Sequence, residues 1–152
     1  MSSAYVDALK MLGRRELSES QVRQRLARRD HNADAIDDAI LRLKAERAID
    51  DGRVAEAIAR TETSVKRHGR MRVRRQIESA GISASIARRA VDEAFGALDE
   101  QALIEASLAK RLRGRSELED EAEFARLYRY LTSQGFEHDR VMKVLKNLKP
   151  EA

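Results

Sequence analysis

An internal repeat of about 50 residues runs through the 152-residue chain and constrains its fold more than any other feature. In the central copy, Val73 and Ile77 stand four positions apart, Gly81 follows, and Ile86 and Ala90 form a second pair at the same spacing. Apolar residues four positions apart share one face of a helix, and glycine commonly ends a helix. This copy is therefore predicted to fold as helix, turn and helix.

The same order of apolar residues occurs once before and once after the central copy. The matching positions are Val22, Leu26, Ile36, Ile40 and Leu43 in the first copy, and Leu127, Leu131, Val141, Leu145 and Leu148 in the last. Helical repeats of this kind stack along one axis. We therefore predict an all-α protein of about nine helices, arranged as three tandem three-helix repeats in an elongated array. The predicted repeats are 1–50, 51–97 and 98–152.

Composition agrees with a helical fold and excludes several classes of protein. Charged residues make up 37% of the chain and aromatic residues 4%, which is typical of solvated helices rather than sheets. The absence of cysteine excludes disulfide bonds and thiolate metal sites. No apolar run approaches the ~20 residues of a membrane span, and the N-terminus lacks the pattern of a signal peptide. We expect a soluble, cytoplasmic protein that does not bind membranes.

Helix boundaries are also predicted from the sequence. Ser18 with Gln21, and Ser116 with Glu119, have the spacing of a capping box, in which two side chains satisfy backbone N–H groups at the start of a helix. Each pair is therefore predicted to begin a helix. The helix before the second pair is expected to bury a face made mainly of small residues, namely Ala102, Ala106, Ala109 and Leu112.

No motif for catalysis or metal binding is present. The chain has neither a glycine-rich phosphate loop nor a nucleophile elbow, and no strand is predicted that either could follow. His31, His68 and His138 fall at predicted junctions between helices without a second ligand at suitable spacing, so we interpret them as surface turn residues. We expect no enzyme activity, no bound metal and no cofactor.

Charge is segregated along the chain although the net charge is only +4. Residues 66–89 contain eight basic groups and a single acid, Glu78. Residues 30–51 contain seven acids and three basic groups, and Glu117–Glu123 is a second acidic block. A basic middle between acidic flanks favours a polyanionic partner or an acidic groove on another protein.

The arginines of the central copy are predicted to face solvent. With Val73 and Ile77 buried, Arg75 lies opposite the core, with Arg72 and Arg74 on its two flanks. A basic face that is merely solvated is the alternative, but such faces interleave acidic residues, which are nearly absent here. We therefore expect an interaction face that also draws on the aligned helix of the third copy and consists of Arg67, Arg70, Arg72, Arg74, Arg75, Arg126 and Arg129.

Several short motifs occur in a fixed order along the chain. They are Ala8–Leu12 with Arg14–Ser18, Ile49–Asp51 with Arg53–Ala55, Gly69–Ile77 with Gly81–Ile82, and Leu131–Phe136. In this order and spacing they resemble the RecX family, whose members regulate the RecA recombinase. The resemblance covers about Ala4 to Leu148.

The resemblance implies a curved array of three three-helix repeats that binds in the groove of the RecA filament on DNA. It implies inhibition of the recombinase and coprotease activities of RecA, in DNA repair and the SOS response, without catalysis by the chain itself. We expect a monomer. Binding to single- and double-stranded DNA without sequence preference is compatible with this hypothesis.

A direct nucleic-acid binder of the helix-turn-helix type is the alternative hypothesis. An arginine-rich helix after a tight turn has the pattern of such a motif, and phosphate contacts need only Lys and Arg. Against base recognition, the exposed face offers Gln76 but few other groups that pair with base edges. The two hypotheses differ in whether the chain acts on bare DNA or only on the RecA filament.

Overall fold

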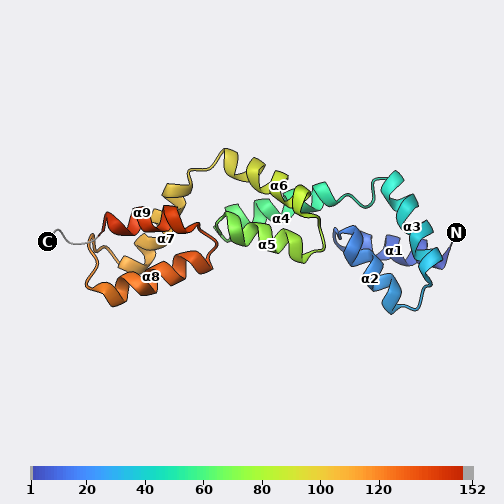
Figure 1. Cartoon of the computed structure of the whole chain (residues 1–152). Helices are drawn as coiled ribbons and strands as arrows, with labels where there is room; N and C mark the ends of the chain where they lie inside the picture. Colours follow the sequence, from blue (N-terminus) through green and yellow to red (C-terminus); the bar gives the residue numbers. More distant parts are fainter. Residues whose placement is uncertain (1, 149–152) are drawn as a thin grey trace. The chain divides into compact units, whose positions relative to one another are not determined.

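The computed structural model describes residues 2–148, and within this part of the chain it contains nine helices and no strand (Figure 1). The helices are α1 (Ser3–Arg14), α2 (Glu19–Arg28), α3 (Ala33–Ala45), α4 (Asp51–Ser64), α5 (Arg70–Ser79), α6 (Ala84–Gly96), α7 (Glu100–Leu112), α8 (Glu121–Ser133) and α9 (His138–Lys146). The predicted all-α fold of three-helix repeats is confirmed. Among the described helices, none combines the length and the apolar character that crossing a bilayer requires.

Contacts group the described residues into two compact units. Unit one contains the residues up to Ile58 together with Gln76–Ala90, and unit two contains Ala59–Arg75 together with the residues from Val91 onward. Helices α4, α5 and α6 each contribute residues to both units. The predicted middle repeat, 51–97, is therefore shared between the two, and the repeat boundaries stay a prediction.

Helices α1, α2 and α3 of unit one enclose a core of aliphatic side chains. Val22, Leu26, Ile40 and Leu43 are buried, as their helical spacing predicts. Tyr5 of α1 joins this core and donates a hydrogen bond from its hydroxyl to Glu46 Oε2 at 2.6 Å. That bond raises the pKa of Tyr5 and lowers the pKa of Glu46.

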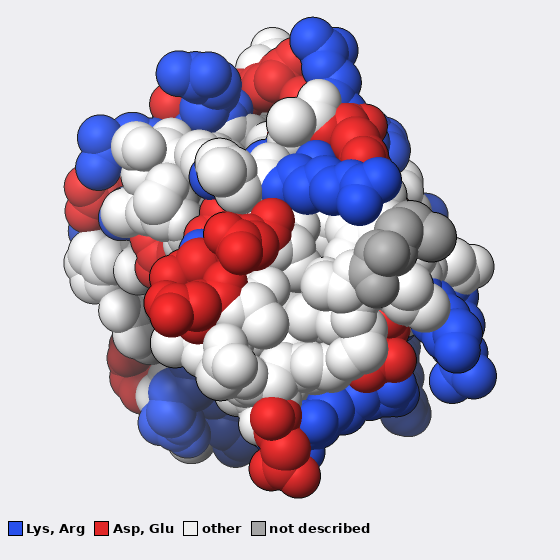
Figure 2. Space-filling model, turned by 90° about the vertical axis from the view of Figure 1, so that its right-hand side faces the viewer, with Lys and Arg blue, Asp and Glu red and all other residues white. Residues whose placement is uncertain are grey.

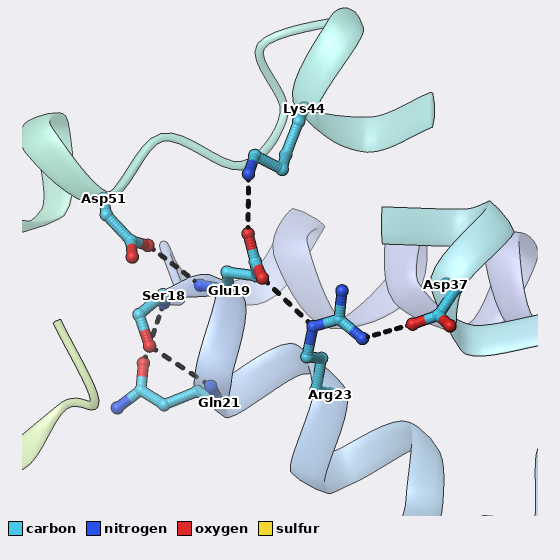
Figure 3. Close-up of polar contacts among 7 residues, drawn as sticks. All are labelled: Ser18, Glu19, Gln21, Arg23, Asp37, Lys44 and Asp51. Atoms are coloured by element: carbon cyan, nitrogen blue, oxygen red, sulfur yellow. Dashed lines mark hydrogen bonds and ion pairs between the residues drawn. The ribbon is translucent and has the colours of Figure 1, made fainter. Parts of the chain in front are cut away.

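The start of α2 is held by the predicted capping box and by a network of charged groups (Figure 3). Ser18 Oγ accepts from the backbone N–H of Gln21, and the Gln21 side chain accepts from the backbone N–H of Ser18. Glu19 lies 2.9 Å from Lys44 Nζ and 3.0 Å from Arg23 Nε. These ion pairs lower the pKa of Glu19, with the hydrogen bond from Lys44 as the largest cause, and they connect α2 to α3.

In unit two, α7, α8 and α9 enclose the second core, and one prediction about α7 is wrong. Ala102, Ala106 and Ala109 are exposed, whereas the buried face consists of Ile104, Leu108 and Leu112. Both sets have helical spacing, so periodicity alone does not choose between them. The larger side chains bury more apolar area, and hydrophobic stabilisation is roughly proportional to that area.

The predicted start of α8 is also wrong, because Ser116 and Glu119 do not form a capping box. The N-cap is Asp120, whose side chain accepts from the backbone N–H of Glu123 at 2.8 Å. Before it the chain is irregular and buries Leu118, whose backbone N–H donates to the carbonyl of Leu148 at 3.0 Å. Burying Leu118 in this way delays the helix to residue 121.

The loop before α5 and the turn between α8 and α9 approach each other through two glycines of unit two. Gly69 N donates to the carbonyl of Gln134 at 2.8 Å, and Met71 N donates to that of Gly135 at 3.0 Å. A Cβ on Gly69 would lie 2.5 Å from the carbonyl carbon of Gly135, which itself has a φ of 99°. Both positions require glycine. A Cβ at Gly69 has no space, and residues with a Cβ rarely adopt the φ of Gly135.

We predict that Gly69→Ala lowers the free energy of unfolding by about 1–3 kcal/mol, because the added methyl group meets backbone atoms that cannot move aside independently. Gly13→Ala is the matched control, since a Cβ there meets nothing within 4 Å. Gly13 lies inside α1, so alanine should raise the free energy of unfolding by up to about 1 kcal/mol. Chemical denaturation measures both changes. Equal stabilities for the two variants would contradict the close approach of Gly69 to Gly135.

The environment of Glu123 predicts that the free energy of unfolding depends on pH in the acidic range. Its carboxylate receives two hydrogen bonds from Arg115, at 3.0 and 2.8 Å, and one from the backbone N–H of Glu119. Chiefly because of Arg115, the pKa of Glu123 falls from 4.5 to about 2. A carboxyl group whose pKa is lower in the folded state contributes stability above its unfolded pKa, and loses it as the pH falls through the folded pKa.

Glu123→Gln should therefore lower the free energy of unfolding at pH 7, and the difference from the wild type should shrink between about pH 4.5 and about pH 2. Denaturation at a series of pH values measures this. The control is Glu117→Gln at an exposed position, where we expect little change in stability. A difference that stays constant down to pH 2 would contradict the effect of Arg115 on Glu123.

Candidate interaction surface

Helix α5 presents its predicted arginines unequally. Val73 and Ile77 are completely buried, so Arg75 lies on the opposite side of the helix and is exposed. Arg72 is half-buried, and its Nη1 donates to the carbonyl of Ser133 at 3.2 Å. This bond connects the start of α5 to the end of α8. Arg72 therefore lies beside α8 in unit two, whereas Arg75 faces outward.

Arg70 has a structural role inside unit two. Its Nη1 lies 2.7 Å from Asp92 on α6, its Nε donates to Glu100 on α7, and its guanidinium lies over the ring of Phe95. Burial alone would lower the pKa of Arg70, but the hydrogen bonds that Arg70 donates to Asp92 and Glu100 outweigh burial and raise that pKa. Arg70 therefore stabilises the packing of three helices and is not available to a partner in this arrangement.

Arg74 lies one helical turn after Arg70 and so shares its side of α5 rather than that of Arg72. It is exposed. The three arginines expected to act together thus point in different directions: Arg72 toward α8, Arg75 outward, and Arg74 to the side of Arg70.

Helix α8 carries a polar stripe that contains two of the predicted arginines. Arg126, Arg129, Tyr130 and Ser133 follow one another at helical spacing and lie on one side, and both arginines are exposed. Arg126 also makes a small contribution to lowering the pKa of Glu123. Because Arg72 bonds to the carbonyl of Ser133, this stripe continues to the start of α5.

A shallow hollow of about 290 Å³ adjoins the stripe. It lies between the loop after α4 and helices α7 and α8, and its lining includes Lys66, Arg67, Lys110, Tyr130 and Gln134. The ring of Tyr130 is covered by the guanidinium of Arg111, which lies 3.5 Å from its centroid. We call the combined region the basic surface, made of Lys66, Arg67, Arg72, Arg75, Lys110, Arg126 and Arg129.

Three residues of this region were not predicted from the sequence. Lys66 is one of the eight basic groups of residues 66–89 but is not among the predicted site residues; its Nζ lies 3.3 Å from Glu62 at the edge of the hollow. Tyr130 could have been found, since it stands four positions after Arg126 on the same helix. No local signal marks Lys110, because it comes from a helix more than 40 positions beyond Arg67. Only tertiary packing brings these groups together.

The prediction that the histidines are surface turn residues is wrong for His68. Its side chain is buried, and Nδ1 forms a short contact with the carboxylate of Glu62. Burial would raise the pKa of Glu62, but the hydrogen bonds from His68 and Lys66 outweigh it and lower that pKa. His31 lies 2.7 Å from Asp7. Within residues 2–148, no three His, Cys, Asp or Glu side chains are grouped so that they could hold a metal ion.

Charge on the molecule is not of one sign everywhere. The face shown in Figure 2 carries basic groups and acidic groups around an area of uncharged residues. A mixed face of this kind gives little net attraction for a polyanion. The basic surface differs from it because it gathers cations from one loop and three helices.

We predict effects of different size on stability for two arginines of α5. Arg70→Ala should lower the free energy of unfolding by about 1–3 kcal/mol, because it removes a hydrogen-bond donor from the buried carboxylate of Glu100. Arg75→Ala should change it by no more than about 0.5 kcal/mol, because Arg75 is exposed. Thermal and chemical denaturation measure both. If Arg75→Ala were the more destabilising variant, our division into structural and surface arginines would be wrong.

Comparisons with known proteins agree with the arrangement of helices. A family model for the first three-helix domain of RecX matches residues 4–43, and one for the third three-helix domain of RecX matches residues 99–145. The regulatory protein RecX of Chromohalobacter salexigens is 34% identical over 135 residues, which cover 89% of this chain and 86% of that protein. The regulatory protein RecX of Geobacillus kaustophilus is 30% identical over 146 residues, covering 95% of this chain and 54% of that protein.

The crystal structure of RecX from Lactobacillus salivarius has the same fold. It superposes with a TM-score of 0.77 at 21% sequence identity, covering 95% of this chain and 94% of that chain.

Proposed function

This chain belongs to the RecX family of regulatory proteins, and we propose that it regulates the RecA recombinase by binding the filament that RecA forms on DNA. It acts there as an inhibitor of the recombinase and coprotease activities, in DNA repair and the SOS response. The family supports a regulatory role. The basic surface of unit two is the observation that supports a filament containing DNA as the partner.

The basic surface suits a partner that combines protein with DNA. Exposed arginines such as Arg75 and Arg129 attract a negatively charged filament over a distance and accelerate its association. Arg72 is held in place by the carbonyl of Ser133, so its position costs little further ordering on binding. The chain would act as a monomer in the cytoplasm.

In this proposal, the chain inhibits RecA by binding alone and catalyses no reaction. A bound ligand shifts an equilibrium toward the state that it binds more tightly. A regulator that prefers a filament unable to exchange strands therefore lowers activity by occupancy alone. The cations of the basic surface provide such binding energy, because each contact with a phosphate releases counterions.

The helix-turn-helix alternative is less well supported by the geometry of α5. In that motif, residues at the start of the second helix contact the bases in the major groove. The start of α5 is instead packed against the α8–α9 turn through Gly69, Met71 and Gly135. The basic surface can still contact phosphates. The first turn of α5, however, cannot enter a DNA groove while it is packed against this turn.

The test is a variant in which both exposed arginines change sign, Arg75→Glu with Arg129→Glu. Because phosphate contacts would be lost and repulsion added, we expect at least about a tenfold higher protein concentration to be needed for half-inhibition. The readouts are DNA-dependent ATP hydrolysis and strand exchange by RecA. The control is Arg88→Glu with Arg89→Glu, which changes the charge equally at exposed positions of α6 and should inhibit like the wild type.

If the Arg75 and Arg129 variant inhibited RecA at the same concentrations as the wild type, the basic surface would not be the part of the chain that binds the filament. A wild-type chain with no effect on RecA at any concentration would contradict the proposed function itself. Inhibition that arises only because the chain coats bare DNA, before RecA is added, would favour the alternative.

A further inference from the structure

The hollow beside α7 and α8 differs in shape and chemistry from the rest of the basic surface. It is concave and measures about 290 Å³, near the lower end of the range of about 300–1,000 Å³ in which proteins hold small ligands. Its lining combines three cations with apolar and amide side chains. Contact with a DNA backbone needs only cations, so the uncharged part of this lining has no role in the proposed function.

Three cations converge on the hollow from two elements of unit two. Lys66 and Arg67 belong to the loop after α4, and Lys110 belongs to α7. Glu62 lies 3.3 Å from Lys66 Nζ and also contacts His68. Within residues 2–148, Arg67 and Lys110 form no ion pair, and no Asp or Glu lines the hollow. Like charges placed together cost free energy, and a bound anion of several charges would offset that cost.

The backbone at Arg67 is fixed before any ligand binds. Arg67 has a φ of 57°, in the left-handed region. On either side of it, His68 N donates to the carbonyl of Glu62 at 2.9 Å, and Lys66 N donates to that of Thr61 at 3.2 Å. These bonds form the pattern that commonly ends a helix around a residue of positive φ. A fixed backbone reduces the entropy that the Arg67 side chain loses on binding a ligand.

The uncharged part of the lining suits the flat, partly apolar ring of a base. The side chain of Val65 is accessible to a ligand, since the residue is 74% exposed. Tyr130 is half-buried, and the guanidinium of Arg111 lies 3.5 Å from its ring centroid and holds the ring in place. The amide of Gln134 supplies both a donor and an acceptor, which are the groups that pair with base edges.

We infer that the hollow beside α7 and α8 binds a free nucleoside triphosphate. Lys66, Arg67 and Lys110 contact the triphosphate group, where the planar guanidinium of Arg67 donates paired hydrogen bonds to phosphate oxygens. Val65 and Tyr130 contact the base, and the amide of Gln134 hydrogen-bonds to its edge. Magnesium is not required, because the three cations neutralise the phosphates and no carboxylate among the described residues lines the hollow to hold the ion.

A strand of nucleic acid and an acidic segment of a protein are the competing occupants, and the lining disfavours both. A concave site of about 290 Å³ holds one small molecule, whereas the neighbouring nucleotides of a strand would extend beyond it. A triphosphate concentrates its negative charge on adjacent phosphate groups. The carboxylates of a protein segment are instead spread along a chain, so they match three converging cations less well.

Nucleotide binding does not depend on RecA, but its consequence rests on the proposed function. Lys66, Arg67 and Lys110 belong to the basic surface, so an occupied hollow would no longer offer these charges to the filament. The nucleotide and the filament would therefore compete. The two proposals fail separately, because nucleotide binding is measured on the purified chain without RecA or DNA, whereas the proposed function is measured as inhibition of RecA.

The experiment is isothermal titration calorimetry of the full-length chain with ATP, in a buffer that contains EDTA. The hollow variant is Arg67→Gly with Lys110→Gln, and glycine at position 67 readily adopts the φ found there. The matched control is Arg113→Gly with Arg89→Gln. Arg113 also has a positive φ, 50°, and both control positions are exposed and outside the hollow. Circular dichroism and melting temperature check that the proteins are folded.

We expect the wild type to bind one ATP per chain and the hollow variant to bind at least about tenfold more weakly, because two charge-assisted contacts are lost. The control variant should bind like the wild type. Inorganic tripolyphosphate should bind more weakly than ATP, since it makes no contact with Val65 or Gln134. Excess magnesium should weaken the binding of ATP, because it neutralises the charge that the cations contact.

Absence of ATP binding by the wild type would overturn the inference, as would wild-type affinity in the hollow variant. An equal loss in the control variant would assign the effect to net charge alone. Tripolyphosphate that binds as tightly as ATP would remove the base from the site. Displacement of ATP by poly-glutamate or by an oligonucleotide at equal charge concentration would identify one of the competing occupants. If the hollow variant were unfolded, Lys110→Glu alone at its exposed position would replace it, and wild-type affinity in that folded protein would equally overturn the inference.

Discussion

The structure depends on burying short aliphatic side chains, at helical spacing, between helices that are otherwise charged. With aromatic residues at 4% of the chain, each core is built from residues such as Leu26, Ile40, Ile104 and Leu131. Such cores are small, and small cores leave little margin over the conformational entropy lost on folding. Contacts that need no large side chain therefore become important, such as the backbone approach of Gly69 to Gly135.

Ion pairs at the edges of the cores are a second group of contacts that stabilise the fold without large apolar side chains. Arg70, Arg115 and Arg23 each hold carboxylates on other turns or other helices, and the carboxylates of Glu100 and Glu123 are themselves largely buried. A buried carboxylate must be paired, since leaving it alone costs several kcal/mol, on the order of 3–5. These arginines are consequently committed to the fold, whatever their position in the charge pattern.

The remaining cations are those that define the candidate binding regions. Arg75 and Arg129 in unit two are exposed and belong to the basic surface. Exposed cations cost little in stability, so they are free to vary with function. The proposed regulation of a RecA filament on DNA would use this property, because long-range attraction and counterion release both depend on the number of accessible positive charges.

Local sequence patterns predict the helices, the three-fold repeat and the buried stripes of α2, α3, α5, α8 and α9, because helical periodicity is a local property. They also predict the capping box of Ser18. Where two local patterns competed, as between the alanines of α7 and Ile104, or between Ser116 and Asp120, only tertiary packing decided. The same holds for the arginines. Arg70 contacts Asp92 and Glu100, 22 and 30 positions away, and the lining of the hollow beside α7 and α8 comes from separate elements of the chain. Pairing depends on distance in space, and a charge pattern along the chain does not contain that distance.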